Sequence, residues 1–314
     1  MTLTTTVSGY QLTEQLYCGS RTLVYRAIRE VDRHPVIIKL LQRERPSFSE
    51  LLLFRNQYTI AKNLNLPGIV KPYTLESCHH SYALVMEDFN GISLKEYIED
   101  RRLPVDEFLA IAIQLADILY GLYHQSVIHK DLKPANILIN PKTRQVKLID
   151  FSISSLLPRE TQATQPPNGL EGTLAYLSPE QTGRMNRGID YRSDFYALGV
   201  TFFELLAGEL PFASQDPMEL VHCHVAKQPP PLHEILPTTI PQAISEIVMK
   251  LMTKNAEDRY QSALGLKYDL EQCWQQLQEN GKIAPFTLGE RDICDRFLIP
   301  EKLYGTVKPK SKPC

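Results

Sequence analysis

The chain of 314 residues is 43% hydrophobic, so it is long enough for two lobes or for one large domain with a tail. Its 34 basic residues nearly balance its 36 acidic residues, which gives no indication of a nucleic-acid partner. No apolar run approaches the roughly 20 residues that span a bilayer, and residues 1–10 lack a basic, apolar leader, so we expect no membrane segment and a cytoplasmic protein.

The first part of the chain has the pattern of a small sheet. Residues 10–41 are predicted to form strands, because two runs within them are rich in β-branched and aromatic side chains and a turn separates the runs. A helix is predicted over residues 47–63, where apolar side chains recur at helical spacing. Two further strands are predicted at residues 70–75 and 82–87. Together these elements make a five-stranded sheet with one helix.

The second part of the chain is predicted to be helical. Residues 104–125 and 190–207 are apolar around much of a helical circumference, so both helices are expected inside a helical lobe. Further helices are predicted at residues 216–227, 241–253 and 262–278. A small sheet lobe followed by a larger helical lobe creates a cleft, which is the usual place for a ligand.

The segment His-Lys-Asp-Leu-Lys-Pro-Ala-Asn at residues 129–136 places a carboxylate, an ammonium and an amide on one tight loop. Fourteen positions after Asn136, an apolar strand ends at Asp150. In this frame Asp131 would orient a hydroxyl and accept its proton, Lys133 would offset phosphate charge, and Asn136 and Asp150 would bind Mg²⁺ through oxygen atoms. An isolated aspartate is more often a turn or capping residue. Four polar groups at fixed spacing favour the catalytic interpretation.

This arrangement resembles the catalytic loop of protein kinases, and the resemblance covers about residues 10–278. It implies an α+β, bilobal kinase fold in which a small five-stranded antiparallel sheet lobe carries one helix and a larger lobe is helical. It also implies ATP and Mg²⁺ as cofactors and a protein substrate with a Ser or Thr acceptor, since Lys133 is typical of the Ser/Thr class. The expected domains are an extension (1–9), a kinase domain (10–278, with lobes 10–88 and 89–278) and a linker or tail (279–314).

The resemblance also assigns the nucleotide contacts. Lys39 resembles the third-strand lysine that pairs with the α- and β-phosphates, Met86 is the expected gatekeeper, and residues 87–89 form the expected hinge. The full set of expected cofactor-binding residues is Tyr17, Gly19, Val24, Lys39, Met86, Glu87, Phe89, Lys133, Asn136 and Leu138.

The glycine-rich loop departs from the kinase pattern. Tyr17, Gly19 and Thr22 stand where the pattern has three glycines, so only the second glycine is present. Ile37 replaces a small alanine beside adenine, which predicts a narrower nucleotide pocket.

The expected partner of Lys39 also departs from the kinase pattern. Gln57 stands where the family helix has a glutamate, and an amide can accept a hydrogen bond but brings no negative charge. We therefore expect a weaker anchor for Lys39. Glu50 and Glu44 are alternative partners if the register of this helix is shifted.

Two substitutions bear on activation. Lys130 replaces the arginine that grips an activation-loop phosphate in bidentate fashion, so we expect activation without loop phosphorylation, with Thr161 and Thr164 as the remaining candidate sites. Ser152 replaces the glycine after Asp150-Phe151, which reduces backbone freedom but leaves the metal ligand intact. Residues 162–169 are polar, contain two prolines and are predicted to be a mobile loop.

The residues that follow the catalytic loop are also consistent with a Ser/Thr kinase. Residues 172–180 resemble the end of an activation segment, in which Thr173 ties the segment to the catalytic aspartate and lysine. The resemblance implies that Glu180 pairs with Arg259 and that Asp194 holds the catalytic-loop backbone from below.

The C-terminal residues resemble a more specific group of proteins. Residues 286–289 (Phe-Thr-Leu-Gly) and 295–305 are similar to the linker of large bacterial, notably cyanobacterial, signalling proteins. In those proteins a Ser/Thr kinase domain precedes an ATPase-like region, a GAF sensor domain and often a histidine kinase.

Two other functions are consistent with parts of this sequence. A pseudokinase scaffold, which binds nucleotide or a partner without turnover, is favoured by Gln57, Ile37 and the thinned glycine loop, but the complete set of catalytic and metal-binding side chains opposes it. A small-molecule phosphotransferase is disfavoured by the peptide-binding shelf expected around residues 173–180.

Overall fold

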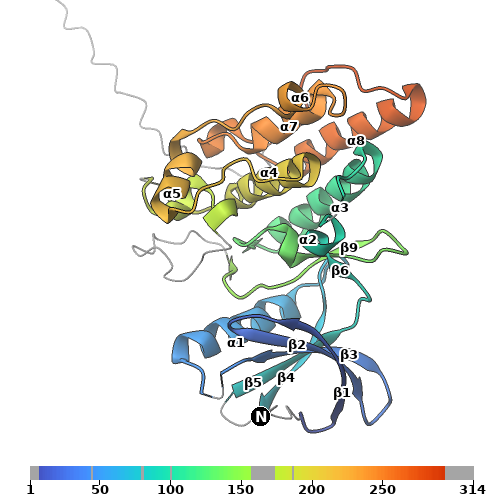
Figure 1. The fold of residues 1–314 in the computed structure, drawn as a ribbon, viewed down its shortest axis with the longest axis vertical. Helices are drawn as coiled ribbons and strands as arrows, with labels where there is room; N and C mark the ends of the chain where they lie inside the picture. The colour runs from blue at the N-terminus through green and yellow to red at the C-terminus, as the bar shows by residue number, and fades with distance from the viewer. Residues whose placement is uncertain are drawn as a thin grey trace, which may run out of the picture.

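The computed structural model describes residues 7–43, 45–78, 81–99, 101–156, 174–185 and 187–293, which form two lobes (Figure 1). The small lobe is a five-stranded antiparallel sheet in the order β1-β2-β3-β5-β4. Its strands are β1 (Tyr10–Cys18), β2 (Thr22–Arg29), β3 (Pro35–Leu41), β4 (Pro72–Cys78) and β5 (Ser81–Glu87). This topology confirms the predicted fold class and sheet. Alternating side chains of β3 and β5 fill a core on the face of the sheet away from helix α1 (Phe48–Asn63).

The long helix α1 lies against this sheet (Figure 1). It begins with a capping box in which Ser47 and Glu50 satisfy each other's backbone N–H groups. Phe54 is buried with Leu84 and Met86 of the sheet, and Ile60 is buried in the core cluster of the large lobe. Gln57 on the same helix is also buried. The helix therefore carries a polar side chain into the interior.

Short strands join the two lobes. β6 (Ile92–Ser93), β8 (Ile137–Ile139) and β9 (Val146–Leu148) form a three-stranded sheet, and β7 (Val127–Ile128) pairs with β10 (Ser155–Leu156). Leu148 donates to the carbonyl of Gly68 (2.8 Å) and accepts from Val70 (3.0 Å). The strand that leads to Asp150 is thus hydrogen-bonded to the base of the small lobe.

The large lobe is a helical core built around α4, of which nearly every residue is buried. α3 and α8 lie side by side next to it (Figure 1). The helices are α2 (Leu94–Tyr97), α3 (Val105–His124), α4 (Arg192–Ala207), α5 (Pro217–Ala226), α6 (Leu232–Ile235), α7 (Gln242–Leu251) and α8 (Ala263–Asn280), with 3-10 turns η1 (Pro134–Asn136), η2 (Leu174–Tyr176), η3 (Pro179–Thr182) and η4 (Ala256–Asp258). The sequence pattern missed α2 and α6, because a single turn shows no periodicity.

Within the described ranges, no helix combines the length and the apolar character that a bilayer span requires.

Residues 281–293 contain neither a helix nor a strand, yet they are held against the large lobe. Asp292 accepts from the backbone N–H groups of Gln261 and Ser262 (2.8 Å each), directly before α8 begins. A β-carbon at Gly265 would collide with Asp292, so this close approach requires glycine. The Phe286 and Leu288 side chains pack against the core of the large lobe.

Candidate active site

The catalytic loop brings three predicted side chains into direct contact. Lys133 Nζ donates to both carboxylate oxygens of Asp131, at 2.9 and 2.7 Å. Asn136 Nδ2 donates to the Asp131 carboxylate and to its backbone carbonyl, each at 2.8 Å. Both donors fix the orientation of the Asp131 carboxylate.

Asp194 supports this loop from α4, as predicted. Its two carboxylate oxygens accept the backbone N–H groups of His129 and Lys130, each at 2.7 Å. Burial raises the pKa of Asp194 above its usual value, although His129 and these two N–H groups favour the charged form. Lys130 has a positive φ of 68°, so the support holds a backbone conformation that side-chain-bearing residues rarely adopt.

Asp150 lies at the point where the two lobes meet. Lys39 Nζ on β3 donates to Asp150 Oδ2 (3.1 Å) and to Gln57 Oε1 on α1 (2.9 Å). Burial alone would raise the pKa of Asp150, but the charge of Lys39 and hydrogen bonds from Ser152 and Lys39 outweigh it and lower the pKa to about 2. Asp150 is therefore ionised at neutral pH.

Gln57 is thus the partner of Lys39, as the predicted register required. Glu50 is instead bound to Ser47 at the beginning of α1, and Glu44 lies outside the described residues. The anchor of Lys39 on α1 consequently has no negative charge.

The two expected metal ligands are neighbours. Ile137 pairs with Leu148 across β8 and β9, and Ile149 N donates to the Asn136 carbonyl (3.0 Å). This register brings Asn136 beside the residue that precedes Asp150. An amide oxygen and an ionised carboxylate are hard oxygen donors of the kind that Mg²⁺ prefers, so the donor set fits this ion.

The sheet supplies an apolar wall next to these polar groups. Val24 on β2 pairs with Lys39, which pairs in turn with Leu84 on β5. Met86, Leu138 and Ile37 belong to one apolar cluster on the face of the sheet that α1 covers. A small cavity of about 10 Å³, room for about one water molecule, lies among side chains that include Met86, Gln57 and Asp150.

The turn between β1 and β2 replaces a full glycine-rich loop. Tyr17 is 57% exposed, and its ring folds over Gly19, where a β-carbon would collide with it. Gly19 N donates to the Thr22 carbonyl (2.9 Å). Gln42, with its amide nitrogen toward the turn, donates to the carbonyls of Gly19 (2.7 Å) and Ser20 (2.9 Å). A side chain at position 19 would therefore displace the exposed Tyr17 ring from its place over the turn.

The predicted hinge is fixed from both sides. The Glu87 carboxylate accepts from Lys71 N (3.0 Å) and pairs with Lys147. Asn140 Nδ2 donates to the Phe89 carbonyl (3.2 Å). The buried carboxylate of Asp88 accepts from Arg26 Nε (2.8 Å), which ties the hinge to β2.

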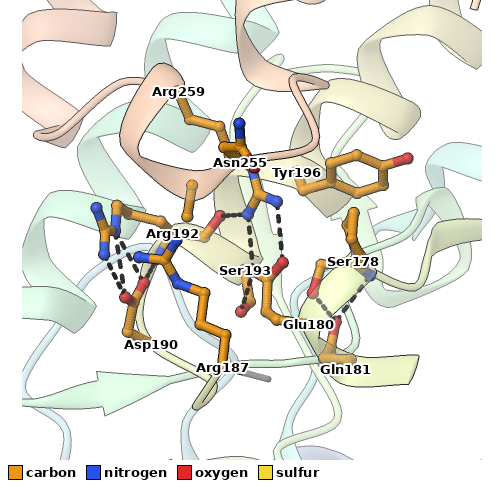
Figure 2. Close-up of polar contacts among 12 residues, drawn as sticks. Ser178, Glu180, Gln181, Arg187, Asp190, Arg192, Ser193, Tyr196, Asn255 and Arg259 are labelled. Atoms are coloured by element: carbon orange, nitrogen blue, oxygen red, sulfur yellow. Dashed lines mark hydrogen bonds and ion pairs between the residues drawn. The ribbon is translucent and has the colours of Figure 1, made fainter. Parts of the chain in front are cut away.

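The end of the activation segment is held by a buried ion pair, shown in Figure 2. Arg259 donates to the two oxygens of Glu180, at 2.7 and 2.9 Å, as predicted. Ser193 Oγ also donates to Glu180 (2.7 Å). Burial alone would raise the pKa of Glu180, but the hydrogen bonds and charge of Arg259 outweigh it and lower the pKa.

Several predicted features lie outside the described residues, namely Thr173, Thr161, Thr164, residues 162–169 and residues 295–305. Sequence reasoning missed two amides that join the site to its surroundings. Gln181 Nε2 donates to the Lys130 carbonyl (3.0 Å), and Asn56 on α1 donates to the backbone after Asp150. Their targets lie 51 and 96–98 positions away in the sequence, so local pattern gave no signal for either amide.

Comparisons with known proteins agree with this geometry. A family model described as a protein kinase domain matches residues 10–273. Serine/threonine-protein kinase PknB of Mycobacterium leprae is 34% identical over 273 residues, which cover 83% of this chain and 42% of that protein. Serine/threonine-protein kinase PrkC of Bacillus subtilis is 32% identical over 289 residues, which cover 90% of this chain and 43% of that protein.

A third relative, hybrid signal transduction histidine kinase G of Dictyostelium discoideum, is 33% identical over 293 residues, covering 66% of this chain and 8% of that protein. The chain thus spans less than half the length of these three relatives. The family model covers most of the chain, and the predicted resemblance is confirmed. The chain belongs to the protein kinase domain family.

Proposed function

We propose that this chain is a Ser/Thr protein kinase that transfers the γ-phosphoryl group of ATP to a protein hydroxyl. One observation carries the proposal: Asp131 is oriented by Lys133 and Asn136, while Lys39 holds the ionised Asp150. Phosphoryl transfer depends on positioning and on charge stabilisation, and these are the groups that supply both.

Each residue has a proposed role in that reaction. Asp131 orients the acceptor hydroxyl and accepts its proton, and Lys133 offsets the charge that develops nearby. Asn136 and Asp150 would hold Mg²⁺, and Lys39 would contact the nucleotide phosphates. Bound Mg²⁺ and ATP supply the phosphoryl donor and neutralise part of its charge.

The proposed adenine site lies between the two lobes. Val24 and Leu138 would contact the base on opposite faces, Met86 would border it, and the backbone of residues 87–89 would provide polar contacts. Tyr17 and Gly19 would cover the phosphates. The positions of Met86 and Leu138 in one apolar cluster support this arrangement.

The Ser/Thr class rests on Lys133 and on the relatives, two of which are named serine/threonine-protein kinases. We propose a signalling role beside further domains, with the kinase domain at residues 10–278. The likeness of residues 286–289 and 295–305 to linkers of multidomain proteins supports this role, as does a relative named a hybrid signal transduction histidine kinase.

The second candidate function is a nucleotide-binding scaffold without turnover. The contact of Lys39 with the uncharged Gln57 favours the scaffold, because the carboxylate that usually anchors this lysine is absent. The intact contacts among Asp131, Lys133 and Asn136 favour catalysis instead.

Incubation of the chain with radiolabelled ATP, Mg²⁺ and a generic basic protein separates the two functions. We expect label transfer by the wild type and a loss of about 10²-fold or more in Asp131→Asn, because general-base catalysis contributes on that order. Asp106→Asn, at an exposed carboxylate in the first turn of α3, is the matched control and should retain full activity.

Asp150→Ala should abolish transfer and also weaken nucleotide binding in the presence of Mg²⁺, measured by titration calorimetry. Nucleotide binding by the wild type without label transfer would favour the scaffold. Full autophosphorylation by Asp150→Ala would show that the metal assignment is wrong.

A further inference from the structure

Asn56 on α1 reaches across to the segment that follows Asp150. Its Nδ2 lies 2.9 Å from the Ser152 carbonyl oxygen, 3.0 Å from that of Ser154 and 3.5 Å from that of Phe151. An amide nitrogen has two protons, so the two short contacts are full hydrogen bonds. A single side chain thus satisfies the carbonyls of Ser152 and Ser154 and lies close to that of Phe151.

Asn56 stands next to Gln57, and the two amides have different targets. Consecutive helical residues point about 100° apart, so Gln57 reaches Lys39 on β3 while Asn56 reaches the backbone after Asp150. Together they tie α1 to the sheet of the small lobe and to the metal-site segment.

The segment that Asn56 holds is connected to the catalytic loop. Ser154 is buried, and its Oγ donates to the His129 carbonyl (3.0 Å). The His129 ring packs edge-on against Phe151, with ring centroids 4.8 Å apart. His129 N is in turn held by Asp194. A continuous set of contacts therefore runs from α1 to the support of Asp131.

The backbone around Asp150 explains why a glycine is not needed at position 152. Asp150 itself takes the positive φ of 65°, a conformation that aspartate tolerates better than most residues. Ser152 is not among the described residues with positive φ. Its side chain is compatible with this state, in which its carbonyl points to Asn56.

We propose that Asn56 is a positioning residue that holds α1 and the segment after Asp150 in the assembled arrangement. This inference rests on the proposed kinase function. The Lys39–Gln57 hydrogen bond has an ionised donor but an uncharged acceptor, so it lacks the ion-pair attraction that a carboxylate would add and fixes α1 less firmly. The bonds made by Asn56 compensate without adding charge beside the phosphates.

The test compares Asn56→Ala with Asn63→Ala, which removes an exposed amide from the same helix. Two lost hydrogen bonds predict a decrease of about tenfold in kcat/KM for Mg²⁺-ATP in Asn56→Ala, with an unchanged KM for a peptide substrate. Asn63→Ala should match the wild type in both constants. Asn56→Asp should be worse than Asn56→Ala, because a carboxylate would face carbonyl oxygens.

Rescue distinguishes positioning from a general loss of stability. Gln57→Glu would restore a charged anchor for α1, so it should recover most of the activity lost in Asn56→Ala while giving a smaller gain in the wild type. A melting temperature lowered in Asn56→Ala with no change in ATP kinetics, or no rescue by Gln57→Glu, would overturn the proposal.

Amide hydrogen exchange in the nucleotide-free chain supplies a readout that does not depend on turnover. Asn56→Ala should exchange faster than Asn63→Ala at residues 151–156, and Gln57→Glu should slow that exchange again. If the wild type failed to transfer phosphate, this measurement would still test Asn56, and equal exchange in both alanine variants would contradict its role.

Discussion

In the large lobe a fully buried ion pair joins Arg259 to Glu180, whereas in the small lobe the anchor of Lys39 on α1 ends in the neutral Gln57. The side chains of Arg259 and Glu180 are 0% and 2% exposed. Lys39 and Asp150 are 12% and 27% exposed. The large-lobe pair is therefore closed to water, whereas Lys39 and Asp150 remain partly open to solvent and ligand, although Gln57 itself is buried.

The difference follows from how each charge is satisfied. The Arg259 guanidinium donates to both oxygens of Glu180 and also to the backbone carbonyls of Arg192, Thr253 and Lys254. Figure 2 shows this pair enclosed between the activation-segment end and the loop before α8. So complete a set of partners offsets the cost of desolvation. It leaves no free bonding capacity for a ligand, so this pair is structural.

The small-lobe anchor leaves capacity for a ligand. Gln57 accepts one hydrogen bond from Lys39 without neutralising it, so the positive charge of Lys39 remains for Asp150 and for the proposed phosphates. The contact with Gln57 thus holds α1 less firmly than an ion pair would, and the hydrogen bonds of Asn56 compensate in part.

The largest expected effect comes from breaking the buried pair. Arg259→Ala should lower the free energy of unfolding by about 3–5 kcal/mol, because it leaves Glu180 buried without its partner. Urea denaturation followed by circular dichroism measures the loss. Arg144→Ala is the control, since Arg144 is half exposed where it pairs with Glu107, and it should cost less than about 1 kcal/mol. Equal losses in the two variants would contradict the comparison.

A smaller effect is expected from acid. The pKa of Asp150 is about 2 in the folded protein against a usual 3.8, so its contribution to stability is present above the usual pKa and is lost as the pH falls toward 2. That contribution is about 2 kcal/mol. The free energy of unfolding of Asp150→Asn should decrease less than that of the wild type between about pH 5 and pH 2. Parallel pH profiles would show that Lys39 does not favour the charged form of Asp150.

The smallest expected effect comes from adding charge to the small-lobe anchor. Gln57→Glu should tighten Mg²⁺-ATP binding roughly two- to fivefold, as expected for one partly exposed ion pair. The gain should shrink in about 0.5 M salt, because screening weakens such pairs. Glu50→Gln removes a charge from the same helix without touching Lys39, so its affinity for Mg²⁺-ATP should equal that of the wild type. An unchanged affinity in Gln57→Glu would show that the neutral amide holds Lys39 as well as a carboxylate does.

Local pattern was enough to predict most of the architecture. Apolar residues recur every two positions in the strands around Lys39, and about every 3.6 positions in the helix that carries Gln57 and in the long helices of the large lobe. The structure places these elements within a few residues of the prediction. The catalytic loop could be recognised because Asp131, Lys133 and Asn136 lie within six positions, so their spacing alone constrains their contacts.

The partners across the fold could not be predicted in the same way. Asn56 bonds to residues 95 to 98 positions away, and nothing in the pattern of α1 distinguishes it from a solvated asparagine. The docking of Asp292 onto the backbone before α8 was missed because residues 281–293 have no periodicity and are held by hydrogen bonds and close packing.

The sequence by itself determined the two lobes, the catalytic loop and the loss of charge at position 57, because each is encoded in residue types at short spacing. Only the tertiary structure decided that Gln57 faces Lys39 and that Asn56 holds the segment after Asp150. Those contacts depend on how α1 packs against distant backbone, and the free energy of that packing is distributed over the whole fold.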